Sequence, residues 1–343
     1  MSNTVGRVSA FAAATGIGSW PGTAPRPAAQ VVVGELHRLP HLVELPARGV
    51  GADVIGRAGA LLVDIAIDTT PRGYRLTARP GGVTRRARSL LDEDVDALEE
   101  AWERAGLRGG GRTVKLQAPG PVTLAAQLEL AGGHRAITDG AALRDLAASL
   151  AEGVAMHQRQ VAKRLGAAAL VQLDEPLLPA ALAGRLSGVT SLSPVHPVDD
   201  AVAIGLLDLC VGALDGSVAL HCCAPDIPWN VLKRSNIDAV AVDASTVRNS
   251  HVDGLGEFLD AGRSVLLGVI PSTARAVPPS VSDVVKATVS LTDRLGLGRA
   301  ALRTRVGVTP ACGLAGATAK WATSATRLAQ KVADVLAEDP EGI

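Results

Sequence analysis

Residue types that bind soft metal ions stand together in the stretch SVALHCCAPD, residues 217–226. A short apolar run at residues 218–220, bounded by a glycine and a proline, predicts a buried strand that leads into them. Because side chains on a strand alternate between its faces, His221 and Cys223 share one face and Cys222 points to the other. An imidazole beside a thiol at the end of a buried strand supplies two ligands of a zinc site.

The elements that must position these residues are short apolar runs separated by helical patterns. Strands are expected at residues 14–20, 41–45, 114–116, 168–173, 218–220, 239–242, 265–270 and 304–308. Helices are expected at residues 27–37, 92–105, 141–165, 199–211, 254–262, 281–295 and 317–336. Strands alternating with helices indicate a parallel sheet, and eight strands close a (β/α)8 TIM barrel. The predicted fold class is therefore α/β, with a TIM barrel as its architecture.

The domain organisation follows from the absence of any linker or shift in composition. Residues 1–343 are expected to form a single catalytic domain, with an elaborated segment around residues 48–90. An open, doubly wound sheet is the main alternative, but no G-x-G-x-x-G run follows a strand in the setting that a dinucleotide site requires.

Composition excludes several classes of function. Lysine plus arginine equal aspartate plus glutamate at 34 each, and aromatic residues make up only 2% of the 343 residues, which argues against nucleic-acid binding. No apolar run is long enough to span a bilayer, so no membrane partner is expected. The four cysteines are too few and too irregularly spaced for a disulfide framework, and they favour a reduced, cytoplasmic protein.

Polar residues that follow the predicted strands would meet at one mouth, because the active site of a TIM barrel lies at the carboxyl ends of its strands. The residues at these ends are Ser19, Glu44, Thr123, Asp174, Glu175, His221, Cys223, Asp243 and Cys312. From them we predict a zinc site made of His221, Cys223, Asp243 and Cys312. The wide spacing of these ligands along the chain favours an open catalytic site over a structural zinc finger.

Each predicted ligand also has a simpler interpretation. A cysteine in an apolar strand is most often a small buried hydrophobic residue, and His221 alone could be a core histidine with its hydrogen bonds satisfied. Asp243 could instead cap a following helix, since it begins the run DAST. Glu44 and Asp174 are predicted to bind an ammonium group of a small substrate, with helix capping or an ion pair to Arg48 as the alternative.

Seven short motifs, in order, carry a resemblance to a known family. They are GSWPGT, HLVELPARG, APGPVT, VQLDEP, LHCCAP, AVAVDAS and VTPACGL. With them the chain resembles, over nearly its whole length, the C-terminal catalytic barrel of cobalamin-independent methionine synthase, in a short form lacking the N-terminal barrel. The resemblance implies a zinc-dependent transfer of a methyl group to the sulfur of homocysteine.

The resemblance also implies roles for individual residues. His221, Cys223 and Cys312 would hold Zn²⁺, and Asp243 stands where the family has a zinc-binding glutamate. Gly18 and Ser19 match the loop that contacts homocysteine, and Glu44 and Asp174 match the acids that take its amino group.

The chain departs from the family on the side of the methyl donor. Gln127 stands where a folate-contacting tryptophan is expected, and GVIPSTA lacks the histidine thought to protonate the leaving folate, so no general acid is assigned. The donor is therefore expected to be methyltetrahydrofolate or a methylcorrinoid protein. Two alternatives remain: a barrel that acts on another thiol or on a corrinoid, and a non-catalytic zinc-binding barrel.

Overall fold

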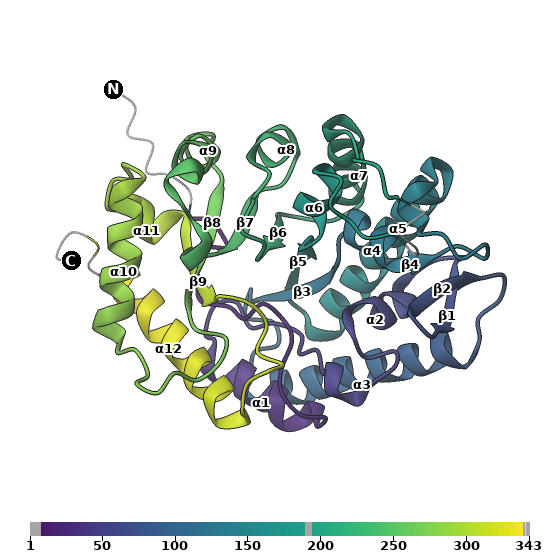
Figure 1. Cartoon of the computed structure of the whole chain (residues 1–343). Coiled ribbons are helices and arrows are strands. Elements are labelled where there is room, and N and C mark those ends of the chain that lie inside the picture. The colour runs from purple at the N-terminus through teal and green to yellow at the C-terminus, as the bar shows by residue number, and fades with distance from the viewer. Residues whose placement is uncertain (1–7, 189–193, 339, 341–343) are drawn as a thin grey trace.

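A curled parallel sheet forms the centre of the protein, as the computed structural model shows for residues 8–188, 194–338 and 340 (Figure 1). Its strands run in the order β3 (Thr113–Pro119), β5 (Ala168–Asp174), β6 (Val218–Cys222), β7 (Ala239–Asp243), β8 (Ser264–Ile270) and β9 (Val306–Pro310). Every neighbouring pair is parallel. This six-stranded α/β arrangement fits a TIM-like barrel.

Two of the eight expected strands are not regular strands. The segments expected as strands at residues 14–20 and 41–45 join their neighbours through isolated parallel bridges, Ala14 to Val308, Ser19 to Glu44 and His41 to Lys115. Glycines explain the irregularity: a Cβ atom on Gly16 would lie 2.2 Å from Nε2 of His41. The prediction of eight regular strands is therefore wrong for these two segments, although both remain extended beside the sheet.

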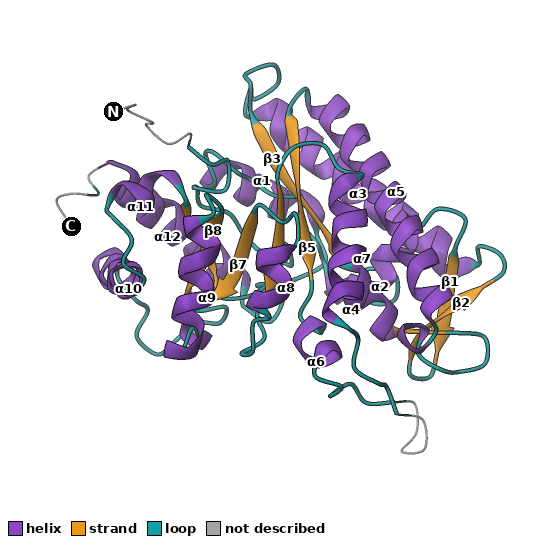
Figure 2. Cartoon of the chain, turned by 90° about the horizontal axis from the view of Figure 1, so that it is seen from above, coloured by secondary structure: helices purple, strands orange, loops and turns teal. Residues whose placement is uncertain are grey.

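Helices cover the outer face of the sheet, as Figures 1 and 2 show. The longer ones are α1 (Pro25–Glu35), α3 (Gly82–Arg104), α5 (Gly140–Leu165), α7 (Asp200–Gly212), α9 (Asn249–Asp260), α10 (Val281–Arg294) and α12 (Ala319–Glu338). The shorter ones are α2 (Val54–Leu61), α4 (Pro121–Gln127), α6 (Leu178–Leu182), α8 (Trp229–Arg234) and α11 (Ala300–Thr304). Three 3₁₀ turns, η1 (Pro46–Arg48), η2 (Ala136–Thr138) and η3 (Ala244–Thr246), complete the described elements.

Local sequence sets the ends of the longest helix, α5. Oδ1 of Asp139 accepts the N–H groups of Ala141 at 2.8 Å and Ala142 at 3.0 Å, which satisfies two of the free donors at the start of the helix. Gly166 ends it in the left-handed region at φ 60°, where glycine avoids the steric cost of a Cβ atom.

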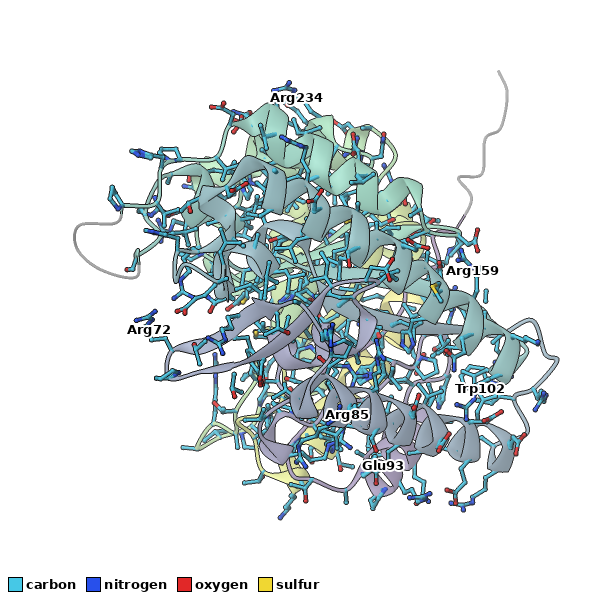
Figure 3. All side chains as sticks on the ribbon, turned by 90° about the vertical axis from the view of Figure 1, so that its right-hand side faces the viewer. Arg72, Arg85, Glu93, Trp102, Arg159 and Arg234 are labelled. Atoms are coloured by element: carbon cyan, nitrogen blue, oxygen red, sulfur yellow. The ribbon has the colours of Figure 1, made fainter. Side chains whose placement is uncertain are left out.

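The segment around residues 48–90 forms a separate layer. β1 (Ala66–Thr70) and β2 (Gly73–Thr77) make an antiparallel hairpin, and β4 (Leu128–Glu129) pairs with β2 in parallel. Figure 2 shows the hairpin set apart from the main sheet, and Figure 3 shows Arg72 at its tip with Arg85, Glu93 and Trp102 along α3. Arg72 Nε donates to Oε1 of Glu129 at 2.8 Å, so an ion pair holds the hairpin to the strand after α4.

The interior of the curled sheet has an apolar floor below a polar layer. The floor is a cluster of buried residues made of Phe11, Ala13, Ile17, Leu39, Leu170, Ala219, Ala239, Ala241 and Leu266. On β3 and β5 the next inward positions are buried polar residues, Lys115, Gln117 and Gln172. The apolar residues of the outward faces pack under the helices. No helix within the described part of the chain is long and apolar enough to cross a membrane.

Candidate metal centre and substrate site

Three side chains converge at the carboxyl end of the sheet and form what we call the metal cluster: His221, Cys223 and Cys312. One ligand atom from each lies within 4.8 Å of the others. His221 belongs to β6, Cys223 is the first residue after β6, and Cys312 comes from the loop after β9. The prediction that Cys222 faces the other way is confirmed, since it is fully buried in the outer core.

The imidazole of His221 is oriented as a metal ligand requires. Its Nδ1 lies 3.0 Å from Oδ1 of Asp174, and a carboxylate at this nitrogen favours the tautomer whose Nε2 is free to bind. Nε2 is buried, and no described residue forms a hydrogen bond with it. A buried nitrogen without a partner costs free energy, which a metal ion beside the two thiols would recover. The donor set of one imidazole and two sulfurs fits zinc.

The two thiols of the metal cluster differ in acidity. A hydrogen bond from Cys223 lowers the pKa of Cys312 to about 4 despite burial, with His221 adding to the effect. The same contact with Cys312, followed by burial, raises the pKa of Cys223. Burial alone lowers the pKa of His221, but the hydrogen bond with Asp174 and the proximity of Cys312 outweigh burial and raise it to about 9. Cys312 is thus a ready thiolate, the form that binds metals.

The fourth predicted ligand, Asp243, is not brought into the metal cluster. It ends β7, as expected, but its Oδ1 accepts the backbone N–H of Ser245 at 2.9 Å and the Ser245 hydroxyl at 2.7 Å. The carboxylate therefore caps η3, which is the alternative suggested by the run DAST. Both capping hydrogen bonds go to Oδ1, so a ligand role for Asp243 would fall to Oδ2.

The loop that presents Cys312 is fixed on two sides. The N–H of Cys312 donates to Oγ of Ser272 at 3.0 Å, and the N–H of Leu314 donates to the carbonyl of Ser19 at 2.9 Å. Gly313 is required here, because a Cβ atom at this position would lie 2.0 Å from Oγ of Ser19. The predicted substrate residue Ser19 therefore lies directly against the loop that carries a metal ligand.

The two acids predicted to bind an ammonium group, Glu44 and Asp174, are both buried. Burial raises the pKa of Glu44 to about 7, although Arg57, whose Nε lies 3.5 Å from Oε1 of Glu44, opposes the shift. The ion-pair partner of Glu44 is therefore Arg57 and not Arg48, which instead contacts Asp94 at 2.6 Å. An ion pair with an arginine is the alternative interpretation of Glu44, and the structure has such a pair with a different arginine. Glu44 therefore has a structural role, and it also lines the interior near Asp174.

Glu175 and Thr123, which also follow predicted strands, have a structural role. The carboxylate of Glu175 accepts the N–H of Val122 and the N–H of Thr123, both at 2.8 Å, and the Thr123 hydroxyl at 2.6 Å. It thereby binds the amino end of α4 and joins it to the end of β5. Burial raises the pKa of Glu175 to about 7.

A buried lysine between the acids is the residue that sequence reasoning missed. Nζ of Lys115 donates to the carbonyl of Ile17 at 3.1 Å, to Oε1 of Gln117 at 3.1 Å and to Oε1 of Gln172 at 2.9 Å. Burial lowers its pKa to about 8, while Asp174 and Glu44 oppose the shift, so the ammonium remains charged at neutral pH. A signal existed: VKLQ and LVQLD interrupt apolar strands with polar residues at every second position.

A groove lies between the ends of β7 and β8 and α10. Its volume is about 700 Å³, and Asp243 and Ala311, the neighbour of Cys312, both line it. Hydroxyl groups and two guanidinium groups complete its lining, from Ser245, Ser272, Thr273, Ser290, Arg275 and Arg294.

Comparisons with known proteins agree with this architecture. A family model described as "Cobalamin-independent synthase, Catalytic domain" matches residues 11–335. A B12-independent methionine synthase from Shewanella sp. W3-18-1, solved in complex with selenomethionine, superposes with a TM-score of 0.61 at 12% identity, covering 97% of this chain and 100% of that one. A methyltransferase from Methanosarcina mazei gives a TM-score of 0.57 at 15% identity, covering 98% and 95%. No curated protein sequence matches the chain.

Proposed function

The chain belongs to the family of the cobalamin-independent synthase catalytic domain, which makes it methyltransferase-like, and on this premise we propose that it transfers a methyl group to the thiol of homocysteine with the help of zinc. The observation that carries the proposal is the metal cluster: an imidazole and two thiols from distant parts of the chain lie within 4.8 Å of one another beside buried acids.

His221, Cys223 and Cys312 would hold the zinc ion. When bound, zinc supplies a site for the substrate thiol and lowers the pKa of that thiol, so that a nucleophilic thiolate exists at neutral pH. Asp243 as a fourth ligand remains a prediction, because its carboxylate caps η3. Three protein ligands with one open position are typical of catalytic zinc sites, and the open position suits the substrate sulfur.

The acids would orient the rest of the substrate. Asp174 and ionised Glu44 offer carboxylate oxygens to the substrate ammonium, and charge-assisted hydrogen bonds of this kind fix orientation as well as affinity. Gly18 and Ser19, beside the Cys312 loop, would contact the same substrate. A sulfur electron pair would form the new bond to the methyl carbon, while the bond from that carbon to its donor breaks and its electron pair leaves with the donor.

The methyl donor would be methyltetrahydrofolate or a methylcorrinoid protein. Gln127, at the end of α4, offers no aromatic face on which a pterin could stack, which favours the corrinoid. The donor would bind in the groove that is lined by Ala311, the chain neighbour of Cys312.

The architecture belongs to the same proposal. The bridges at Ala14, Ser19 and His41 link the two extended segments to β9, to each other and to β3, and with them the sheet would close into a (β/α)8 barrel. A single domain over residues 1–343, in a reduced cytoplasmic setting, is consistent with the four free cysteines.

Two alternatives have specific support. A barrel that acts on another thiol or on a corrinoid would use the same metal cluster. Its substrate would differ from homocysteine in the group that lies near Glu44 and Asp174. A non-catalytic zinc-binding barrel is favoured by the absence of an assigned proton donor and by the capped Asp243.

Zinc analysis combined with a donor panel tests the proposal. The purified protein should hold about one zinc ion per chain and should methylate homocysteine from methyltetrahydrofolate or a methylcorrinoid. Replacing Cys312 by serine should remove zinc and activity and leave the fold intact. Unfolding of Cys312→Ser would instead support a structural zinc, and turnover of a different thiol would support the first alternative.

A further inference from the structure

A buried hydrogen-bond chain connects the interior of the sheet to the metal cluster. Lys115 Nζ donates to Oε1 of Gln172 at 2.9 Å, and Nε2 of Gln172 donates to Oδ1 of Asp174 at 2.7 Å. The same Oδ1 lies 3.0 Å from Nδ1 of His221. We propose that Lys115 and Gln172 are positioning residues, which hold Asp174 against His221 and so present Nε2 of His221 to the metal. The proposal rests on the proposed function, since it concerns the same site.

Only one orientation of the Gln172 amide satisfies its neighbours. An ammonium group has donors only, so the oxygen of the amide must face Lys115. A carboxylate that orients His221 is an acceptor, so the amide nitrogen must face Asp174. This nitrogen also donates to the carbonyl of Ile17 at 2.9 Å, which fixes the side chain from the neighbouring segment. The charge of Lys115 therefore sets the direction of every hydrogen bond in the chain.

The two carboxylate oxygens of Asp174 differ in their hydrogen-bond partners. Gln172 and His221 both contact Oδ1, and no described residue forms a hydrogen bond with Oδ2. Because Gln172 and His221 together fix the plane of the carboxylate, Oδ2 is held in one direction. The proposed ammonium-binding oxygen and the metal-binding nitrogen are thus positioned by the same side chain.

The cost of the arrangement indicates that it has a function. Burying an ammonium group is expensive unless it is fully hydrogen-bonded and close to opposite charge. Lys115 is fully buried and has three acceptors with two carboxylates nearby, whereas an apolar side chain could fill this interior position without that cost. Partners that orient a metal-binding histidine typically change metal affinity by about 10- to 100-fold when they are lost.

The test compares two substitutions of buried glutamines. Methionine has nearly the same side-chain shape as glutamine. Gln172→Met therefore removes three hydrogen bonds, those to Lys115, Ile17 and Asp174, and keeps the side-chain shape. Gln158→Met is the matched control: Gln158 is also buried, also makes three hydrogen bonds, and lies on α5 away from the metal cluster. Gln117→Met is a second control within the polar layer, because Gln117 accepts from Lys115 and does not contact Asp174. Zinc affinity is measured by competition with a chromophoric chelator, with the unfolding midpoint as a check on folding.

We expect Gln172→Met to weaken zinc binding about tenfold or more, and both controls to bind zinc as the wild type does. We also expect the KM for homocysteine to rise more than the KM for a thiol of the same length without an amino group. Equal zinc affinity in Gln172→Met and the two controls would overturn the inference. If Gln172→Met does not fold, Lys115→Met tests the same chain from its far end, with weaker zinc binding expected and unchanged binding contradicting the proposal. A wild type that binds no zinc would instead defeat the proposed function.

Discussion

The two halves of the site satisfy their polar groups in opposite ways. In what we call the acid cluster, Glu44, Asp174, Lys115 and Gln172, the charged groups meet partners within the protein. In the metal cluster, Nε2 of His221 is buried and makes no hydrogen bond with the described residues, and the two thiols lie within 4.8 Å of each other and of the imidazole. Asp174, a member of the acid cluster, also contacts His221 of the metal cluster.

This difference separates a preorganised region from one that is completed by a ligand. The polar groups of the acid cluster are held by hydrogen bonds and an ion pair within the protein, so its geometry is set before any substrate arrives. The metal cluster carries an unsatisfied nitrogen and an acidic thiol, and both gain from a bound cation. Substitutions in the metal cluster should therefore change zinc binding, and substitutions in or around the acid cluster should change stability or substrate binding.

The largest expected effect comes from two neighbouring cysteines on opposite faces of the β6 segment. Cys223→Ser should weaken zinc binding by more than about 100-fold, because it removes a ligand and not merely a residue that orients one. Cys222→Ser, buried in the outer core, should lower stability and keep its zinc. Metal content and unfolding midpoints of both variants measure this. Equal zinc loss in both variants would mean that folding, and not ligation, controls metal content.

A large loss of stability is expected where the acid cluster is anchored to the outer helices. Asp94 on α3 is fully buried and pairs with Arg57 and with Arg48. Asp94→Ala would leave two buried guanidinium groups without this partner, and we expect the free energy of unfolding to fall by about 3–5 kcal/mol. Chemical denaturation measures it. Glu93→Ala, which loses only a half-exposed contact with Arg48, is the control and should change stability by less than about 1 kcal/mol.

The pH profile should report the acid cluster through Glu44. Its folded pKa of about 7 lies above the usual 4.5, so its contribution to stability is present below pH 4.5 and is lost as pH rises through 7. Binding of an ammonium group needs the ionised form, so kcat/KM for homocysteine should fall about tenfold per pH unit below 7. Steady-state rates at constant ionic strength test this.

Two controls isolate Glu44 in that experiment. Glu44→Gln should lose this limb of the profile, and a thiol without an amino group should not show it in the wild type. The same limb persisting in Glu44→Gln would assign it to another group and remove Glu44 from substrate binding.

The smallest effect is expected at Asp243, and it sharpens the boundary of the metal cluster. As a cap of η3, Asp243→Asn should cost about 1 kcal/mol of stability or less and leave zinc affinity unchanged. If Asp243 is instead a fourth zinc ligand, Asp243→Asn should weaken zinc binding at least as much as Gln172→Met does. Chelator competition on the two variants side by side distinguishes the two roles.

Much of the site could be predicted because strand periodicity places residues reliably. The alternation of His221, Cys222 and Cys223 and the ends of β5, β6, β7 and β9 depend on apolar runs, and the structure has them within a few residues of the expected positions. The position of Cys312 just after the last expected strand grouped it with His221 and Cys223, and the family resemblance implied the same three ligands. The predicted domain limits and substrate residues remain predictions.

The failures have physical causes. In the segment at residues 14–20, the side chains of His41 and Gln117 lie too close to Gly16 and Gly18 for a Cβ atom, which alternation of apolar residues does not reveal. α3 begins at Gly82 instead of near residue 92, because arginine-rich turns continue the helix beyond its apolar stripe. Lys115 and Arg57 were missed because a buried charge is recognisable only from its partners, which lie on other elements.

The most direct test of the account is the metal content and metal spectrum of the purified protein. We predict about one zinc ion per chain, and a cobalt-substituted form with thiolate-to-cobalt absorption that changes when homocysteine is added. Protein that takes up no zinc when the ion is supplied, and whose cobalt spectrum lacks thiolate bands or ignores homocysteine, would contradict the account.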